Sequence, residues 1–191
     1  MDEQHVNHRP AQSNVGLRDY YLTRGLVAGG WVAAAFTIGR ANAILAGALL
    51  VAYPAWDAAA NLFDGARSGG LGRNRSQAVN AVVSGLAAIA ILIALNDTAK
   101  VVEIFGAWAI VAGLLQLATG LRRWKRFGAQ WAMVLSGAQS ALAGGIFIKQ
   151  ALGAPVHGIT DVAPYAGFGA FYFLVSALWL MLRRGAPQRS A

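Results

Sequence analysis

Three polar side chains fall on one face of an otherwise apolar segment, and they are the residues of this sequence best placed for chemistry. Asp57, Asn61 and Asp64 are spaced four and then three residues apart, so in a helix they share one side. A carboxylate at membrane depth is costly and usually faces the interior of a helix bundle or a water-filled cavity. The spacing therefore predicts an interior polar site in which Asp57 lies deeper than Asp64.

This polar face has two interpretations. In the first it is a hydrogen-bonded clamp between helices, with Asn80 and Ser84, four apart in the next apolar segment, as the partners of Asp57. In the second it lines a cavity that opens to the cytoplasm, where Asp57 binds a proton or a cation. Asp64 is followed three residues later by Arg67 and can form an ion pair with it.

Other kinds of chemistry find little support in the residues. The sequence has no cysteine, which excludes disulfides and thiolate ligands. Its three histidines, His5, His8 and His157, are scattered and do not have the spacing of a metal site. The glycine cluster at 69–72 lacks the lysine of a phosphate-binding loop. We therefore expect no catalytic residue, no metal and no cofactor, and hence a protein that is not an enzyme.

The elements that must position the polar face are apolar segments of membrane-spanning length. The chain has 191 residues, of which 57% are hydrophobic and 13% charged, whereas a soluble domain has about a quarter charged residues. Most of the apolar segments approach the roughly 20 residues that cross a bilayer as a helix. Six segments are expected, near 25–39, 42–64, 77–95, 101–121, 129–151 and 163–182.

The expected architecture is an all-α polytopic membrane protein, with six transmembrane helices arranged as three hairpins in contact with the lipid bilayer. Leu121-Arg122-Arg123 recurs as Leu182-Arg183-Arg184, and Phe105-Gly106-Ala107 as Phe168-Gly169-Ala170, which favours internal duplication. We expect a six-helix domain over 17–184 between two disordered cytoplasmic tails, 1–16 and 185–191.

The basic residues predict how the chain is oriented. With six spans, all but three of the sixteen Lys and Arg residues fall on one side of the membrane, and basic loops stay in the cytoplasm. We therefore expect both termini in the cytoplasm of a bacterial cell and the helices in its inner membrane. The net charge of +8 is explained by this topology, so we expect no nucleic-acid partner. The three exceptions are Arg40, Lys100 and Lys149.

Glycines recur at helical spacing in several of the predicted helices. Small residues on one face let helices approach closely in lipid. We expect these glycines to pack helices within one chain, and the alternative is a face that joins copies in a homo-oligomer. The residues are Gly25, Gly29, Gly106, Gly113, Gly120, Gly137 and Gly144.

The stretch from Phe105 to Leu117, with Gly106 and Gly113 and the following Leu121-Arg122-Arg123, resembles the HdeD-like family of small bacterial membrane proteins. The resemblance covers roughly residues 77–184. It implies a six-helix inner-membrane protein that is not an enzyme and that supports envelope or acid-stress tolerance. Asp57, Asn61 and Asp64 are not part of that family pattern. The alternative function, a small transporter or channel for protons, cations or a small solute, would use this polar face.

Overall fold

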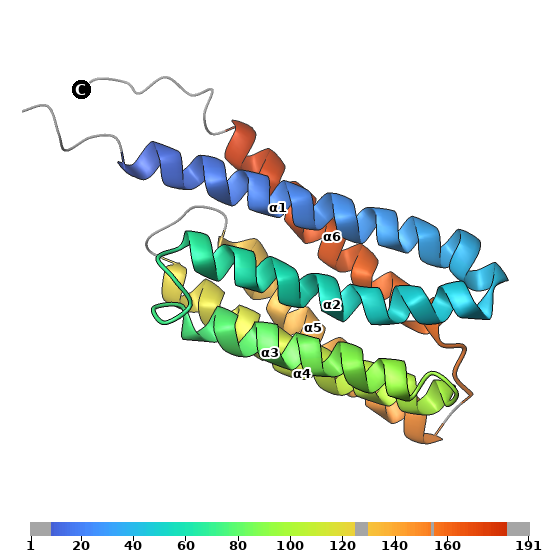
Figure 1. Cartoon of the computed structure of the whole chain (residues 1–191). Helices are drawn as coiled ribbons and strands as arrows, with labels where there is room; N and C mark the ends of the chain where they lie inside the picture. The colour runs from blue at the N-terminus through green and yellow to red at the C-terminus, as the bar shows by residue number, and fades with distance from the viewer. Residues whose placement is uncertain (1–8, 125–129, 154, 183–191) are drawn as a thin grey trace, which may run out of the picture.

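Helices account for almost all of the structure, a computed structural model that describes residues 9–124, 130–153 and 155–182. No strand occurs within these ranges, so the expected all-α fold is confirmed. The helices follow one another along the bundle in alternating directions (Figure 1). They are α1 (Arg9–Ala34), continued by the π-helical turn η1 (Ala35–Gly39), α2 (Ala43–Arg67), α3 (Arg75–Ile93), α4 (Thr98–Arg123), α5 (Gln130–Gly153) and α6 (Ile159–Leu182).

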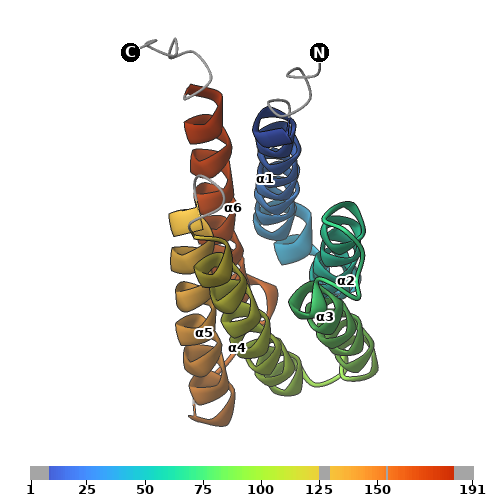
Figure 2. The same ribbon diagram turned by 90° about the vertical axis from the view of Figure 1, so that its left-hand side faces the viewer.

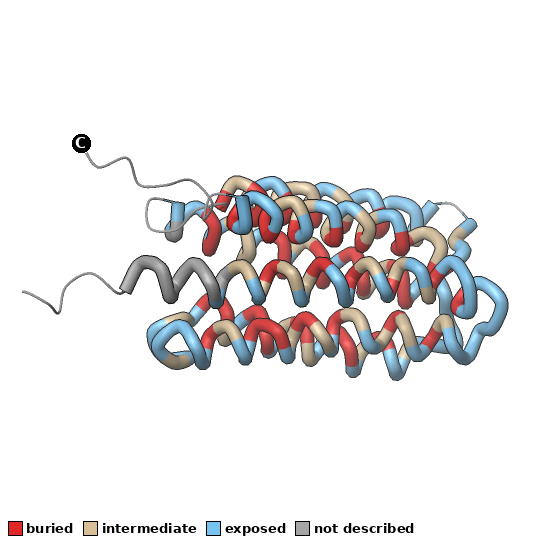
Figure 3. Tube along the Cα trace, turned by 90° about the horizontal axis from the view of Figure 1, so that it is seen from above, coloured by how far each residue is buried: buried red, intermediate tan, exposed pale blue. Residues whose placement is uncertain are grey.

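All six helices contain a stretch long and apolar enough to cross a membrane. Buried residues face the inside of the bundle and exposed residues face outwards along each helix (Figure 3). Large apolar side chains such as Ile44, Ile93 and Leu152 are among the most exposed. Outward-facing apolar side chains along six such helices are what contact with lipid requires. The chain is therefore an integral membrane protein that spans the bilayer several times.

The first helix begins earlier than expected. It starts at Arg9, and its membrane-spanning part runs from Arg18 to Gly39, whereas the apolar run predicted a span over 25–39. Residues 9–16 are therefore helical and not disordered, because helix formation depends on backbone hydrogen bonds and does not need an apolar side chain at every position. Residues 1–8 and 185–191, the rest of the two expected tails, lie outside the described residues.

Two side-chain caps explain where α2 and α4 begin. The Asn42 side chain accepts hydrogen bonds from the backbone N–H groups of Ile44 and Leu45 at the start of α2. The Asp97 side chain accepts one from Lys100 at the start of α4. Such caps satisfy amide groups that have no partner within the helix.

The closest helix pairs differ from the expected hairpins. Consecutive helices run antiparallel, but the most extensive packing joins α4 with α5, α1 with α6, and α2 with α3 (Figures 1 and 2). By contrast, α1 and α2 contact each other little. The bundle therefore consists of three tight pairs that are offset by one helix from the pairing that duplication suggested.

Glycines form the seam between α4 and α5. A Cβ atom added to Gly113 would lie 2.6 Å from the carbonyl oxygen of Gly137, and one added to Gly137 would lie 2.7 Å from that of Gly113. Gly106 faces Gly144 in the same way, and Gly120 faces Val134. The two backbones are thus in direct contact, and the expected stripe packs helices within one chain.

The expected pair of glycines in α1 behaves differently. A Cβ atom on Gly25 would lie 2.7 Å from Cγ of Leu174 in α6, whereas one on Gly29 would meet nothing within 4 Å. The prediction of close packing was therefore wrong for Gly29. A helix turns about 100° per residue, so four residues leave Gly29 rotated by about 40° from Gly25 and away from this contact.

The seam leads to a stability prediction for two adjacent glycines. Gly144→Leu forces a side chain into the backbone of α4, and we expect it to cost about 1–3 kcal/mol or more of folding free energy. Gly145→Leu is the matched control, because its added Cβ meets nothing within 4 Å. Thermal unfolding in detergent measures both variants. Equal melting temperatures would show that the seam does not limit stability.

Candidate functional site

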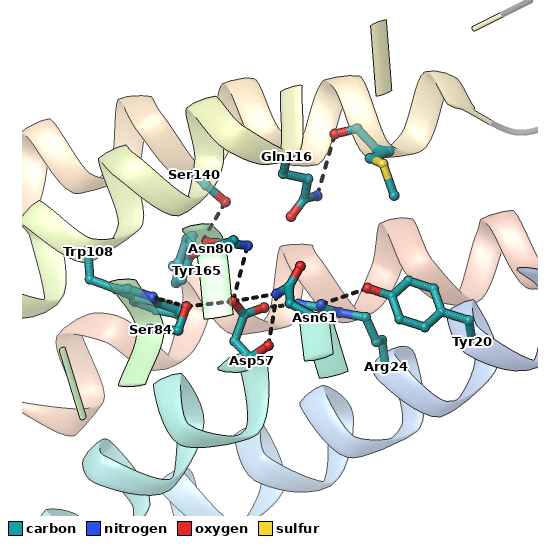
Figure 4. Close-up of polar contacts among 11 residues, drawn as sticks. Tyr20, Arg24, Asp57, Asn61, Asn80, Ser84, Trp108, Gln116, Ser140 and Tyr165 are labelled. Carbon is teal, nitrogen blue, oxygen red and sulfur yellow. Dashed lines mark hydrogen bonds and ion pairs between the residues drawn. The ribbon is translucent and has the colours of Figure 1, made fainter. Parts of the chain in front are cut away.

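Asp57 points into the bundle and is surrounded by hydrogen-bond donors (Figure 4). It is only 6% exposed. One carboxylate oxygen, Oδ2, accepts hydrogen bonds from the Ser84 hydroxyl at 2.8 Å, from the Asn61 amide at 3.0 Å and from the Asn80 amide at 3.4 Å. Four of the five polar residues predicted from the sequence are therefore brought together, two from α2 and two from α3.

The other oxygen of Asp57 accepts a hydrogen bond from a residue that the sequence analysis placed elsewhere. Arg24 of α1 forms an ion pair with Asp57 through Nη2 and Oδ1. Its second terminal nitrogen donates to the Tyr20 hydroxyl at 3.0 Å, and its guanidinium lies 4.9 Å from the ring centre of Phe173 in α6. Arg24 was counted among the basic residues that flank the membrane, whereas it lies within the first span.

A signal for Arg24 was present in the sequence. The apolar run at 25–39 is too short to cross a bilayer, and lengthening it towards the N-terminus places Arg24 inside the membrane. A buried carboxylate also needs a cation or several donors. The four-residue spacing of Tyr20 and Arg24 further places both side chains on one face of a helix.

The network extends beyond the ion pair to a fourth helix. Trp108 of α4 donates from Nε1 to the Ser84 hydroxyl oxygen at 2.9 Å. Asn61 also donates to the backbone carbonyl of Asp57 at 2.8 Å, while Oδ1 of Asn80 is buried without a hydrogen-bond partner. Side chains from α1, α2, α3 and α4 are thus linked through one carboxylate, so removing that carboxylate leaves several buried donors unpaired.

Asp64 lies apart from this network, two helical turns further along α2. Its Oδ2 atom accepts a hydrogen bond from Gln77 at 3.0 Å, and its Oδ1 atom accepts one from Ser68 at 3.4 Å. The expected ion pair with Arg67 is wrong, because the guanidinium of Arg67 instead lies over the ring of Phe63, 4.2 Å from its centre. Stacking of this kind is a common alternative for arginine beside an aromatic ring.

A cavity of about 1050 Å³ opens at the end of the bundle that holds the connection between α2 and α3. Residues of α1, α2, α3, α4 and α5 line it, and it extends inwards to Arg24. Asp57 is not part of its lining, so the guanidinium of Arg24 separates the carboxylate from the cavity. Its lining residues include Tyr20, Trp56, Ala60, Phe63, Asp64, Arg67, Arg73, Gln77, Thr119 and Arg122.

Two small voids lie next to this cavity and continue towards the middle of the bundle. One, of about 20 Å³, shares Tyr20 and Arg24 with the cavity and also touches Asn80 and Gln116. The other, of about 40 Å³, touches Arg24, Asp57 and Gln116. Each is large enough for a water molecule and has polar side chains in its lining. A row of polar residues therefore leads inwards from the cavity past the ion pair.

Aromatic side chains close this row beyond the ion pair. Phe105 is fully buried, and its ring centre lies 5.0 Å from that of Trp108 and 6.1 Å from those of Tyr53 and Tyr165. Phe147 packs against the same ring at 6.2 Å. Rings at these separations form a dense apolar core, so the polar row is open at one end and sealed at the other.

The ion pair leads to a prediction for single and double substitutions. Asp57→Leu leaves the guanidinium of Arg24 buried without a counter-ion, and we expect a loss of about 3–5 kcal/mol in stability. Combining Asp57→Leu with Arg24→Met removes both charges and should recover much of that loss.

The control for this pair of variants is Asp19→Asn. Asp19 pairs with Arg18 at an exposed position, where an ion pair contributes little. Thermal unfolding in detergent is the measurement for all the variants. If the effects of Asp57→Leu and Arg24→Met simply add, the two side chains do not interact as the structure indicates.

Neither a metal-binding group among the described residues nor a match to a known protein helps to identify this site. Within the described ranges, no group of three His, Cys, Asp or Glu side chains could hold a metal ion. Comparison with protein-family models, with curated protein sequences and with solved structures finds no match for this chain.

Proposed function

We propose that this chain is a small transporter of the inner membrane and not an enzyme. It admits a solute into the cavity, and the Arg24–Asp57 ion pair closes the inner end of that cavity. The observation that carries this proposal is a cavity of about 1050 Å³ that ends on a buried ion pair. Sites for small molecules are typically about 300–1,000 Å³, so an organic solute fits.

The position of the charges supports transport rather than a purely structural role. Ionisable side chains inside a membrane bundle commonly mark the path of a substrate or an ion. Transporters bind near the middle of the membrane and expose that site to one side at a time. A polar row that is open at one end and closed by Phe105 and Trp108 at the other corresponds to one of these two states.

The proposal includes an orientation. The cavity opens beside Arg67, Arg73 and Arg122, which lie in or next to the basic connections that should stay in the cytoplasm. Solute would therefore enter the cavity from the cytoplasm in this state.

Labelling of an introduced cysteine tests the cavity and its orientation together. The chain has no cysteine, so Ala60→Cys provides a single thiol on the cavity wall. A thiol reacts as the thiolate, which forms only in contact with water. We expect a membrane-impermeant, uncharged thiol reagent to label this variant in inside-out vesicles and not in right-side-out vesicles.

The matched control is Leu62→Cys, two residues further along α2, where the side chain is 46% exposed on the lipid-facing surface. It should react slowly from both sides. Labelling of Ala60→Cys only in right-side-out vesicles would reverse the orientation. Absence of labelling from either side would refute a solvent-filled cavity and, with it, the proposed transport.

A second candidate function is an HdeD-like role in acid tolerance, without a transported solute. Its specific support is that Asp57 already receives hydrogen bonds from Arg24, Asn61, Asn80 and Ser84, as a structural clamp requires.

The acid-tolerance role predicts a phenotype in cells that can be measured without a transport assay. Survival of acid challenge should fall when the gene is deleted, and expression of the Asp57→Asn variant should restore it, because an amide keeps most of the clamp. Normal survival of the deletion strain would contradict this role.

A further inference from the structure

We propose that the solute of the cavity is an anion, a molecule that carries a carboxylate or a phosphate group, and that Arg122 of α4 is the residue that binds this group. The inference rests on the proposed function, because it names the class of solute for the same cavity. It also replaces the expectation, made from Asp57 alone, that the site takes a proton or a cation.

The charges that line the cavity are mostly positive. Among the described residues they are four arginines and two aspartates. Arg24 is neutralised by Asp57, and Asp19 is neutralised by Arg18. The other lining charges are Arg67, Arg73 and Arg122 and the carboxylate of Asp64, which accepts hydrogen bonds from Gln77 and Ser68. A cleft with such a surplus of one sign between low-dielectric walls concentrates the opposite ion.

Arg122 is held in place by neutral groups only. Its Nη2 atom donates to the hydroxyl oxygen of Ser76 at 2.5 Å and to that of Thr119 at 3.4 Å, and its Nε atom donates to the carbonyl oxygen of Ala118 at 3.4 Å. Among the described residues, no carboxylate lies within ion-pair distance of Arg122, and its Nη1 atom has no hydrogen-bond partner.

The two hydroxyl groups around Arg122 are themselves fixed. Ser76 and Thr119 are both buried, and Thr119 donates to Ser76 at 2.9 Å. The guanidinium is therefore oriented before any solute arrives, and the N–H groups of Nη1 remain to donate a charge-assisted hydrogen bond to an oxygen atom of a carboxylate or a phosphate. An oriented arginine without a counter-ion on a cavity wall is the arrangement that binds such a group.

The rest of the cavity fits the body of an organic anion. Arg67 lies over the Phe63 ring and Arg73 belongs to the connection between α2 and α3, so both add positive charge around the opening. Tyr20 and Trp56 provide aromatic surface further in. The same anionic group occurs on free solutes and on the headgroups of anionic lipids, and the experiment below separates these two sources.

The sign of the charge is tested by comparing two thiol reagents on Ala60→Cys. The reagents are an anionic and a cationic methanethiosulfonate of similar size, each rate being divided by its rate with a small thiol in solution. We expect the anionic reagent to react roughly tenfold faster at low salt, at the lower end of electrostatic rate enhancement, and the preference to shrink at high salt.

Substitutions then identify the residue responsible. In the Ala60→Cys background, Arg122→Gln should remove most of the preference, whereas Arg122→Lys, which keeps the charge, should retain it. Arg40→Gln is the matched control, because Arg40 is also exposed but does not line the cavity, and it should leave the preference unchanged. Loss of the preference in Arg40→Gln, or its survival in Arg122→Gln, would overturn the role of Arg122.

Protection from labelling identifies the source of the anion. With an uncharged reagent and nanodiscs of phosphatidylcholine, millimolar inorganic phosphate should slow labelling of Ala60→Cys, and Arg122→Gln should abolish this effect. Slower labelling only in nanodiscs that contain phosphatidylglycerol would support the same site with a lipid as its ligand.

Two negative results have different meanings. If both charged reagents react equally and neither phosphate nor phosphatidylglycerol protects, the anion inference is wrong while the water-accessible cavity of the proposed function stands. If no reagent, charged or uncharged, labels Ala60→Cys, the proposed function and this inference fail together.

Discussion

The ion pair between Arg24 and Asp57 imposes a condition that the surrounding helices have to meet. Each charge loses several kcal/mol of hydration when it is buried, and the pair is tolerated only if its remaining hydrogen-bonding atoms are satisfied. The second oxygen of Asp57 accordingly accepts hydrogen bonds from α2 and α3, and Arg24 contacts Tyr20 and the ring of Phe173. One carboxylate thus connects α1, α2 and α3.

The helices around this ion pair are packed unevenly: α4 and α5 pack closely, whereas α1 and α2 contact each other little. The seam between α4 and α5 brings the backbones of Gly113 and Gly137 into contact, so these two helices form one closely packed wall. The helices that carry the two charges, α1 and α2, contact each other little, and the cavity lies between their ends and this wall. In the proposed transporter, a solute would pass Arg67, Arg73 and Arg122 before it reaches the ion pair at the inner end of the cavity.

Much of the architecture could be predicted because membrane helices obey local rules. Six helices follow from the length of the apolar runs, and the glycines of α4 and α5 follow from small residues repeated on one helical face. The interior position of Asp57 follows from the cost of a charge in lipid. The spacing of Asn80 and Ser84 places both on one face of the next helix, and in the structure both donate to Asp57 as expected.

The sequence by itself determined what depends on length, periodicity and the transfer of side chains into lipid: the number of spans, the interior polar face and the glycine stripe. Only the tertiary structure decided which faces meet. It made Arg24 the counter-ion of Asp57, placed the Arg67 guanidinium over Phe63, excluded Gly29 from close packing and left Arg122 without a carboxylate partner among the described residues. The reason is that periodicity shows which residues share a side of one helix, whereas partners from different helices depend on how these helices are rotated and paired, which no local pattern specifies.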